Sequence, residues 1–451
     1  NFRLKDNIFS TYRFQRLEFS EAYLGNKHFF QSSVNKNGFQ LNLNSSFLNS
    51  DSELFQSEFL RLNAQSTYSL KKYWIGAKID LEDNQEKNKQ TDSLTLLSQR
   101  FTDYETYVGV GDSVKVFAQL GYRYRQTDSI NMGRLERAST SNDIYIKSRL
   151  IQKKTSQLNV FANYRRINFS DENKNDQNIL NARLQYNQYF FKQKLNLRTT
   201  YETNSGTVAR QDFTFVQVEP GQGQYTWIDY NNDGVQDLNE FELAQFQDQA
   251  EYVRILLPNQ VFVGINQNRF SEQLILNLSS WQNENGLKKI LSHFYNQSAY
   301  SVDRKIARNG QDFNINPFSS GNSEELALIS NFRNTLFFNR GKQFFTNTYT
   351  FISNANKNLL STGLQENIIK SHQWEFLHKI KENWLINANA IYGENESISE
   401  NFNNRNFKLI SNEAALKVSY LFSTQNRLDA FVEYKNQENT TGPEKLTQLA
   451  L

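Results

Sequence analysis

Long runs of alternating apolar and polar residues are the feature that most limits what this chain can fold into. From residue 114 to residue 125 the even positions are apolar or aromatic, and most odd positions are polar. A period of two places successive side chains on opposite faces of a β-strand, and this run exceeds the ~5–6 residues of an ordinary strand. The run therefore predicts a long strand with one apolar and one polar surface.

The same alternation recurs in hairpins along the whole chain. Short polar turns such as 339–342 join some runs, whereas longer polar stretches separate others. The longer stretches are residues 83–93, 128–142, 171–177, 306–322 and 394–406. Short turns at one end and long loops at the other are typical of transmembrane β-barrels.

We predict an all-β fold, a transmembrane antiparallel up-and-down β-barrel of roughly 16–20 strands with long polar loops on one side. Polar residues on the second strand face suit a water-filled lumen, and aromatic residues near strand ends suit interfacial girdles. A soluble β-sandwich is the alternative, but we expect it to have shorter strands and more than the four prolines found here. No repeat of blade length is present, which disfavours a propeller.

The strand pattern divides the chain into four segments. Residues 1–204 are a first set of barrel hairpins and 261–440 a second set, with a large loop insertion at 205–260 between them. Residues 441–451 form a tail without strand pattern. No apolar run approaches the ~20 residues of a membrane-spanning helix. No signal-peptide pattern follows Asn1, and we expect the chain to be part of a longer protein.

Residues 229–240 have the spacing of a calcium-binding loop. An EF-hand loop supplies oxygen ligands from positions 1, 3, 5, 7, 9 and 12, with Gly at position 6. The matching ligands are Asp229, Asn231, Asp233, the carbonyl of Val235, Asp237 and Glu240. Gly234 takes the sixth position, so we expect calcium as a cofactor, with a metal-free turn rich in Asp and Asn as the alternative. Residues 241–246 suit the start of a short helix, which predicts one loop with at most one flanking helix.

Composition and motifs narrow the function. The chain has 50 Lys and Arg against 47 Asp and Glu, scattered along its length, which gives no reason to expect nucleic acid as a partner. The absence of Cys excludes disulfides and thiolate metal sites. His372 and His378 lie about 20 Å apart along one strand, too far to bind one metal ion. No phosphate loop, nucleophile elbow or dinucleotide motif is present, so we expect no enzyme, with a barrel hydrolase as the less favoured reading.

The hairpin pattern resembles outer-membrane β-barrels of Gram-negative bacteria, and residues 224–242 are similar to a segment of large surface barrels of the Bacteroidota. This resemblance implies an outer-membrane location, contact with outer-membrane lipid, and protein partners in a membrane assembly. We expect a non-enzymatic scaffold or conduit in a surface assembly, for protein export or outer-membrane biogenesis. A porin-like channel for small solutes is the alternative. The charged residues expected on the lumen face are Arg123, Arg125, Arg165, Arg183, Arg198, Glu202, Glu375 and Glu433.

Overall fold

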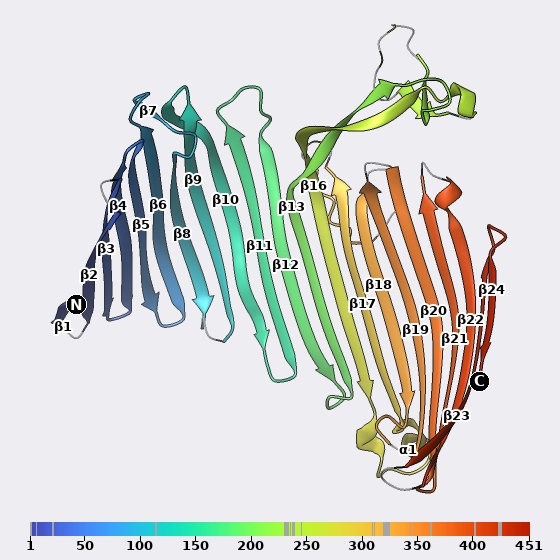
Figure 1. The fold of residues 1–451 in the computed structure, drawn as a ribbon. Coiled ribbons are helices and arrows are strands. Elements are labelled where there is room, and N and C mark those ends of the chain that lie inside the picture. The colour runs from blue at the N-terminus through green and yellow to red at the C-terminus, as the bar shows by residue number, and fades with distance from the viewer. Residues whose placement is uncertain are drawn as a thin grey trace. The chain divides into compact units, whose positions relative to one another are not determined.

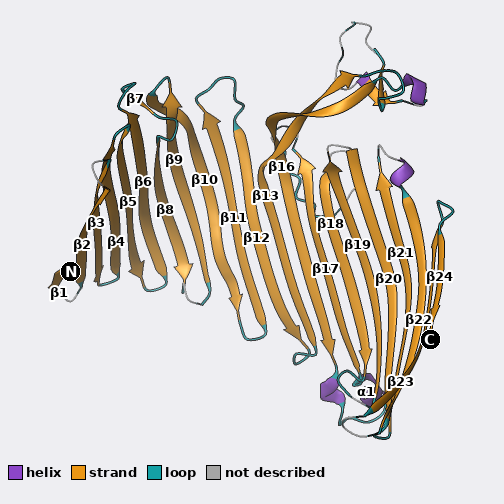
Figure 2. Cartoon of the chain, in the orientation of Figure 1, coloured by secondary structure: helices purple, strands orange, loops and turns teal. Residues whose placement is uncertain are grey.

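The chain is built almost entirely of antiparallel β-strands (Figures 1 and 2). A computed structural model gives its structure. The described residues are all except 1, 6, 20–21, 113–114, 230–233, 235, 237–239, 245, 309, 311, 319–324, 343, 361–362, 401–402 and 423–425. The chain divides into two compact units, Asn1–Gln185 (unit 1) and Tyr186–Leu451 (unit 2).

Unit 1 is a meander in which each long strand pairs antiparallel with the next. Its strands are β1 (Phe2–Lys5), β2 (Ile8–Phe19), β3 (Tyr23–Lys36), β4 (Phe39–Ser52), β5 (Phe55–Leu70), β6 (Tyr73–Asn88), β7 (Ser93–Leu94), β8 (Gln99–Gly111), β9 (Phe117–Asn131), β10 (Arg134–Gln152) and β11 (Ser156–Phe169). The next strand, β12 (Gln177–Phe190), crosses the boundary between the units. The short β7 pairs with the end of β6, and β8 then returns along β6.

Unit 2 repeats this arrangement around a long insertion. Its strands are β13 (Leu195–Gln217), β14 (Tyr225–Trp227), β15 (Phe241–Leu243), β16 (Tyr252–Asn277), β17 (Phe294–Ala307), β18 (Glu325–Phe338), β19 (Phe345–Leu360), β20 (Gly363–Ile380), β21 (Trp384–Ser399), β22 (Phe407–Leu421), β23 (Arg427–Asn439) and β24 (Lys445–Ala450). The helical elements are α1 (Leu287–Leu291) and the 3-10 helices Gln247–Gln249, Ser279–Trp281 and Asn403–Arg405. β13 pairs with β16, and each strand from β16 onward pairs with the next.

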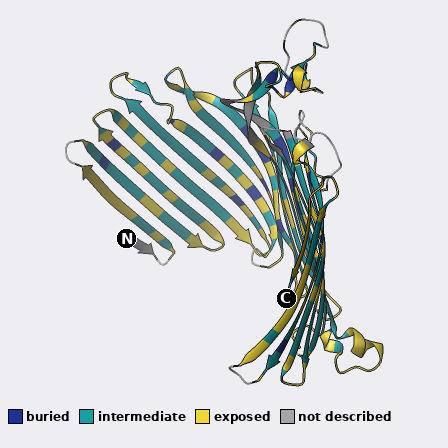
Figure 3. Cartoon of the chain, turned by 45° about the vertical axis from the view of Figure 1, so that its right-hand side comes forward, coloured by how far each residue is buried: buried dark blue, intermediate teal, exposed yellow. Residues whose placement is uncertain are grey.

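The prediction of an all-β, antiparallel up-and-down fold is confirmed. Among the described residues, nineteen strands have at least twelve residues, within the range of roughly 16–20 predicted from the alternating runs. Exposed and less exposed residues alternate along the strands of unit 1 in Figure 3. The period-two pattern therefore corresponds to two sheet faces with different surroundings.

Strands extend through stretches that the alternation assigns to loops. Within 128–142, β9 reaches Asn131 and β10 starts at Arg134, so only Met132 and Gly133 form the turn. Their φ values of 47° and 78° are both positive, as a two-residue type I′ hairpin turn requires. The residues on both faces of these strand ends are mostly polar, so the period of two disappears from the sequence while the backbone hydrogen bonds continue.

Three other segments differ from the sequence-based description. In the 205–260 insertion, β13 continues to Gln217 and β16 begins at Tyr252, which leaves 218–251 between these two long strands. We call 218–251 the insert. Residues 241–243 form strand β15 and not the start of a helix, because β15 pairs with β14. Residues 445–450 form β24, which pairs with β23 although the segment lacks clean alternation.

The two ends of unit 2 differ in their connections. One end carries residues 191–194, 278–293 with α1, 339–344, 381–383 and 422–426, and we call it the α1 end. The opposite end carries the insert and residues 308–324, 361–362, 400–406 and 440–444, and we call it the insert end. Because consecutive strands run in opposite directions, the insert shares its end with the connection between β17 and β18.

Candidate functional site

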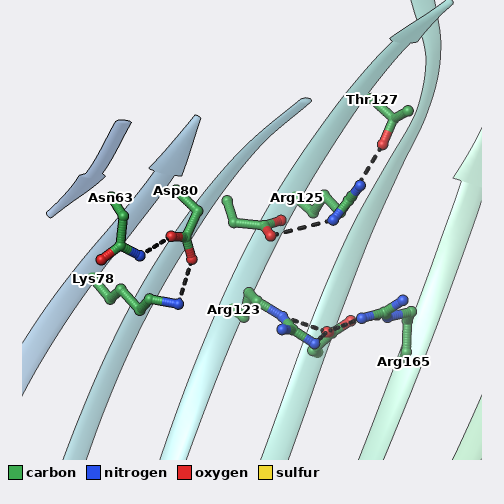
Figure 4. A network of polar contacts seen from close by, with 9 residues as sticks. Asn63, Lys78, Asp80, Arg123, Arg125, Thr127 and Arg165 are labelled. Atoms are coloured by element: carbon green, nitrogen blue, oxygen red, sulfur yellow. Dashed lines mark hydrogen bonds and ion pairs between the residues drawn. The ribbon is translucent and has the colours of Figure 1, made fainter. Parts of the chain in front are cut away.

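The polar face of unit 1 is organised around Asp143 on β10. Its neighbours across the sheet are Arg123 on β9 and Arg165 on β11. The Asp143 side chain is fully buried and accepts hydrogen bonds from Arg123 Nε at 2.8 Å and from Arg165 Nε at 2.7 Å. Both guanidinium groups remain partly exposed, so the pairs form a charged surface, and Figure 4 shows Arg123 and Arg165 pointing toward one another.

A second row of charges begins two residues further along β9, at Arg125, and continues across β8, β6 and β5. Arg125 Nη1 lies 3.3 Å from Asp103 Oδ2, and Asp80 binds both Lys78 and Asn63 (Figure 4). The charges thus occur as neighbouring cations and anions. A surface of this kind attracts water strongly but selects only weakly between positive and negative solutes.

Aromatic rings cover glycines on this polar face. A Cβ atom on Gly76 would lie 2.2 Å from the Tyr107 ring, and one on Gly121 would lie 2.2 Å from the Tyr145 ring. The ring hydroxyls are also held, because Tyr107 contacts Thr67 at 2.7 Å and Tyr145 donates to Glu105 at 2.5 Å. Packing of this type fixes strand register where a glycine would otherwise leave a gap.

The opposite face of unit 1 exposes large apolar side chains. Along β6, the alternate residues from Tyr73 to Leu81 are Tyr73, Ile75, Ala77, Ile79 and Leu81. Tyr73 is 65% exposed and Ile75 57% exposed. The next residue on this face is Asp83, which pairs with Arg100 at 2.9 Å. The apolar band on β6 therefore spans nine residues and ends at a charged pair.

Unit 2 has an apolar band of the same length. Along β21, the alternate residues are Trp384, Ile386, Ala388, Ala390 and Tyr392, and the next on that face are Glu394 and Glu396. Trp384 is 46% exposed, while Glu396 pairs with Lys408 at 3.5 Å. The other face of the sheet carries ion pairs on the neighbouring strands, such as Lys435 on β23 with Glu413 on β22 at 2.8 Å. Each unit thus has one apolar and one polar face.

The connection between β17 and β18 folds back onto unit 2 near the insert end. Arg304 on β17 is fully buried, where its Nε binds Glu325 at 2.7 Å and its Nη1 donates to the Asn316 carbonyl at 3.1 Å. Asn268 on β16 donates to the Asn314 carbonyl at 2.7 Å. Buried side chains of two strands therefore hold residues 312–318 against the sheet.

An aromatic cluster fixes the base of the insert. Phe241 on β15 stacks on Phe215 of β13 with ring centroids 4.1 Å apart, and it also meets Tyr252 edge-on at 5.0 Å. Tyr225 on β14 packs edge-on against Phe215 at 4.9 Å. Burial raises the pKa of the Tyr225 phenol above its ordinary range, and the nearby positive charge of Arg254 opposes this. The ends of residues 229–240 are thus held by two paired strands.

The structure describes two of the six candidate calcium ligands. Asn231, Asp233, Val235 and Asp237 lie outside the described residues. Asp229 Oδ2 accepts a hydrogen bond from the Gly234 N–H at 2.9 Å, and Asp229 Oδ1 is buried with no partner among the described atoms. Glu240 is only 3% exposed, and its Oε2 accepts a hydrogen bond from Trp227 Nε1 at 2.9 Å. Among the described residues, no three His, Asp or Glu side chains cluster as a metal site, so calcium binding stays a prediction.

The four histidines lie in aromatic or polar surroundings. His28 contacts the Tyr12 hydroxyl and His372 the Tyr349 hydroxyl, each at 2.7 Å. His293 contacts the Asn339 side chain and His378 the Phe344 carbonyl. Within the part of the chain that the structure describes, none of these contacts brings a serine hydroxyl to an imidazole.

The arginines of the polar face are predictable from the alternation, whereas the carboxylates that bind them are not. Asp143 was missed because it directly follows the stretch expected as a loop. Asp143 is opposite Arg123 and Arg165 once the turn is placed at Met132 and Gly133. With the turn at Met132 and Gly133, the register of the β9–β10 hairpin is the signal that predicts the pairing of Asp143 with Arg123.

Comparisons with known proteins give structural likeness only. No protein-family model matches the sequence, and no curated protein matches it. The fold is similar to the copper transporter OprC, with 8% identity over 95% of this chain and 72% of that chain, and a TM-score of 0.34. It is also similar to the siderophore receptor PirA from Pseudomonas aeruginosa, with 9% identity over 97% of this chain and 81% of that chain, and a TM-score of 0.36. A third similar structure is the FrpB iron transporter from Neisseria meningitidis, with 8% identity over 96% of this chain and 74% of that chain, and a TM-score of 0.35.

These identities and TM-scores carry no argument about family or activity. The helices give a separate observation: in the described ranges, none is both long and apolar enough to cross a membrane.

Proposed function

We propose that this chain forms part of the wall of an outer-membrane β-barrel in a Gram-negative bacterium and works there as a non-enzymatic conduit or scaffold. The observation that carries the proposal is the nine-residue apolar band on β6 and again on β21. A tilted transmembrane strand needs ~9–11 residues to cross the hydrocarbon core. Lipid is the solvent that makes such a long row of exposed and half-exposed apolar side chains favourable.

The orientation follows from the connections. Barrels of this kind carry their longer loops outside the cell and their shorter turns on the periplasmic side. In unit 2, four of the five connections at the α1 end have six residues or fewer, whereas the insert end carries 218–251 and 308–324. We therefore place the insert on the extracellular side and the α1 end on the periplasmic side.

A conduit or scaffold in a surface assembly fits the paired charges of the polar face. Each of Arg123, Arg125 and Arg165 has a carboxylate partner, so the face is hydrophilic without being strongly selective. We extend the proposal to protein export or outer-membrane biogenesis in the Bacteroidota, on the resemblance of residues 224–242. A porin-like channel is the second candidate, because the same hydrophilic face suits small solutes.

Planar-bilayer recording of the purified full chain tests this proposal. Insertion into vesicles, checked by protection from added protease, is the first requirement, and failure to insert would remove the membrane role. Ohmic single-channel steps would then favour the porin-like channel. An inserted but silent protein would favour the scaffold or a conduit filled by a partner, which chemical crosslinking in native membranes would identify.

We further propose that residues 229–240 bind calcium and stiffen the insert. The Gly234 φ of 71° suits the sharp turn at position 6 of a calcium loop, and Asp229 Oδ1 lacks a partner among the described atoms. The insert contains eight acidic residues and neither Lys nor Arg, so no basic residue within it balances the carboxylates. Asp229 and Glu240 would supply the first and last ligands, and calcium would supply charge neutralisation there.

A further inference from the structure

At the α1 end of unit 2, helix α1 and its connections extend beyond the ends of the strands (Figure 1), and they carry exposed apolar side chains. On α1, Leu287 is 78% exposed and Ile290 57% exposed. Phe191, in the neighbouring connection, is 74% exposed, and Phe344 is 69% exposed. Such side chains are costly to leave in water when they gather on one end of a unit, so this surface needs an apolar neighbour.

The same connections carry an excess of positive charge. Residues 191–194, 278–293, 339–344 and 381–383 contain seven Lys or Arg and two Glu. Among the described residues of these connections, the one ion pair is Lys288 with Glu284 at 3.6 Å, and both side chains are more than half exposed. The insert, at the opposite end, has eight acidic residues and no Lys or Arg. The neighbour of the α1 end should therefore be both apolar and anionic.

The basic residues at this end lie beside aromatic rings. Lys194 Nζ lies 5.4 Å from the Trp281 ring centroid, and the Arg340 guanidinium lies 4.0 Å from that of Tyr295. Long cationic side chains beside Trp and Tyr are typical of the boundary between acyl chains and headgroups, where the ring enters the boundary and the charge stays in water.

We propose that the α1 end binds anionic phospholipid headgroups at the membrane surface. Leu287, Ile290 and Phe191 enter the acyl boundary, while Lys288 and Lys289 contact headgroup phosphates. An amphipathic element of this kind gains from both apolar burial and attraction to anionic lipid. The inference rests on the proposed function, because it requires the apolar band of unit 2 to lie in a bilayer.

The absence of Cys allows single labels to test this in the full chain. Leu287→Cys and Val432→Cys each receive an environment-sensitive fluorophore, and the protein is reconstituted in phosphatidylcholine vesicles with or without phosphatidylglycerol. Val432 lies on the apolar face of β23, so its label reports insertion alone. We expect both labels to shift to the blue, and the Leu287 shift to grow with phosphatidylglycerol and to weaken with salt.

Charge variants identify the headgroup contact. Lys288→Gln with Lys289→Gln should lower the apparent affinity for phosphatidylglycerol, measured from the Leu287 label, by about tenfold or more. The matched double variant Lys408→Gln with Lys445→Gln, near the insert end, should leave the apparent affinity for phosphatidylglycerol unchanged.

Three outcomes would contradict parts of this account. A Val432 shift without a Leu287 shift would overturn the lipid contact and leave the membrane role standing, with a periplasmic protein as the neighbour of α1. A Leu287 shift that ignores phosphatidylglycerol would overturn the headgroup contact. Absence of both shifts would contradict the proposed function itself.

Discussion

At the scale of single residues, Asp143 stabilises the polar face of unit 1 through its ion pairs with Arg123 and Arg165. Asp143→Ala leaves two guanidinium groups without their shared carboxylate. Because both remain 28–29% exposed, the expected loss of unfolding free energy is about 2–3 kcal/mol, below the usual cost of breaking a fully buried pair. Urea titration of the protein in detergent micelles measures it.

Glu18→Ala is the matched control for that substitution. Glu18 pairs with Arg16 at 2.9 Å, but both side chains are more than half exposed. An exposed pair of this kind contributes ~0–1 kcal/mol. Equal effects of the two substitutions would mean that Asp143 acts as an ordinary surface residue.

At the scale of elements, a bound calcium ion would stabilise the insert. Asp233→Ala with Glu240→Ala removes two of the proposed ligands, so calorimetric calcium binding should disappear and proteolysis within 218–251 should quicken. The strands outside the insert should keep their circular dichroism. Asp248→Asn, an acidic residue outside the loop, should leave binding intact. Unchanged titration of the double variant would remove calcium from the account.

The insert should also open at high pH. Burial raises the Tyr225 pKa, so the folded insert keeps the phenolic proton more tightly than the unfolded one, whose pKa is about 10. The resulting stabilisation is complete below pH ~10 and is lost as pH rises through the folded pKa. Limited proteolysis should therefore accelerate above pH ~10 in the native protein. Tyr225→Phe, which has no proton to lose, should show a flatter pH dependence.

The elements also show what the sequence could and could not predict. Strands such as β6 and β21 were predictable because apolar and polar residues alternate through the band. Strand ends outside the band, as in β9 and β10, were not, because both faces are polar there and the alternation disappears. β15 was misread as helix because its conformation depends on pairing with β14 and stacking on Phe215. These contacts are distant in the sequence.

At the scale of the molecule, the candidate site was predictable in kind but not in detail. A polar face rich in Arg followed from the alternation, whereas the pairing of Arg123 and Arg165 through Asp143 needed the register of three strands. The calcium loop came from spacing within twelve residues, so no tertiary knowledge was required. The basic, apolar surface at the α1 end joins connections up to about 190 residues apart, which only the alternating strand directions bring together.

The membrane role makes a depth-dependent prediction. Ala77 lies in the middle of the apolar band on β6, is exposed, and faces the same way as Gln85, which lies beyond the charged Asp83. In a bilayer, Ala77→Arg should lower the free energy of unfolding measured in vesicles by ~2–4 kcal/mol, because a guanidinium at the midplane is costly. Gln85→Arg should cost ~0–1 kcal/mol, because charge near the interface is tolerated. Reversible urea titration in vesicles measures both. If the apolar band faced water, an exposed arginine would be harmless at either position, so equal and small effects would contradict a membrane-spanning wall.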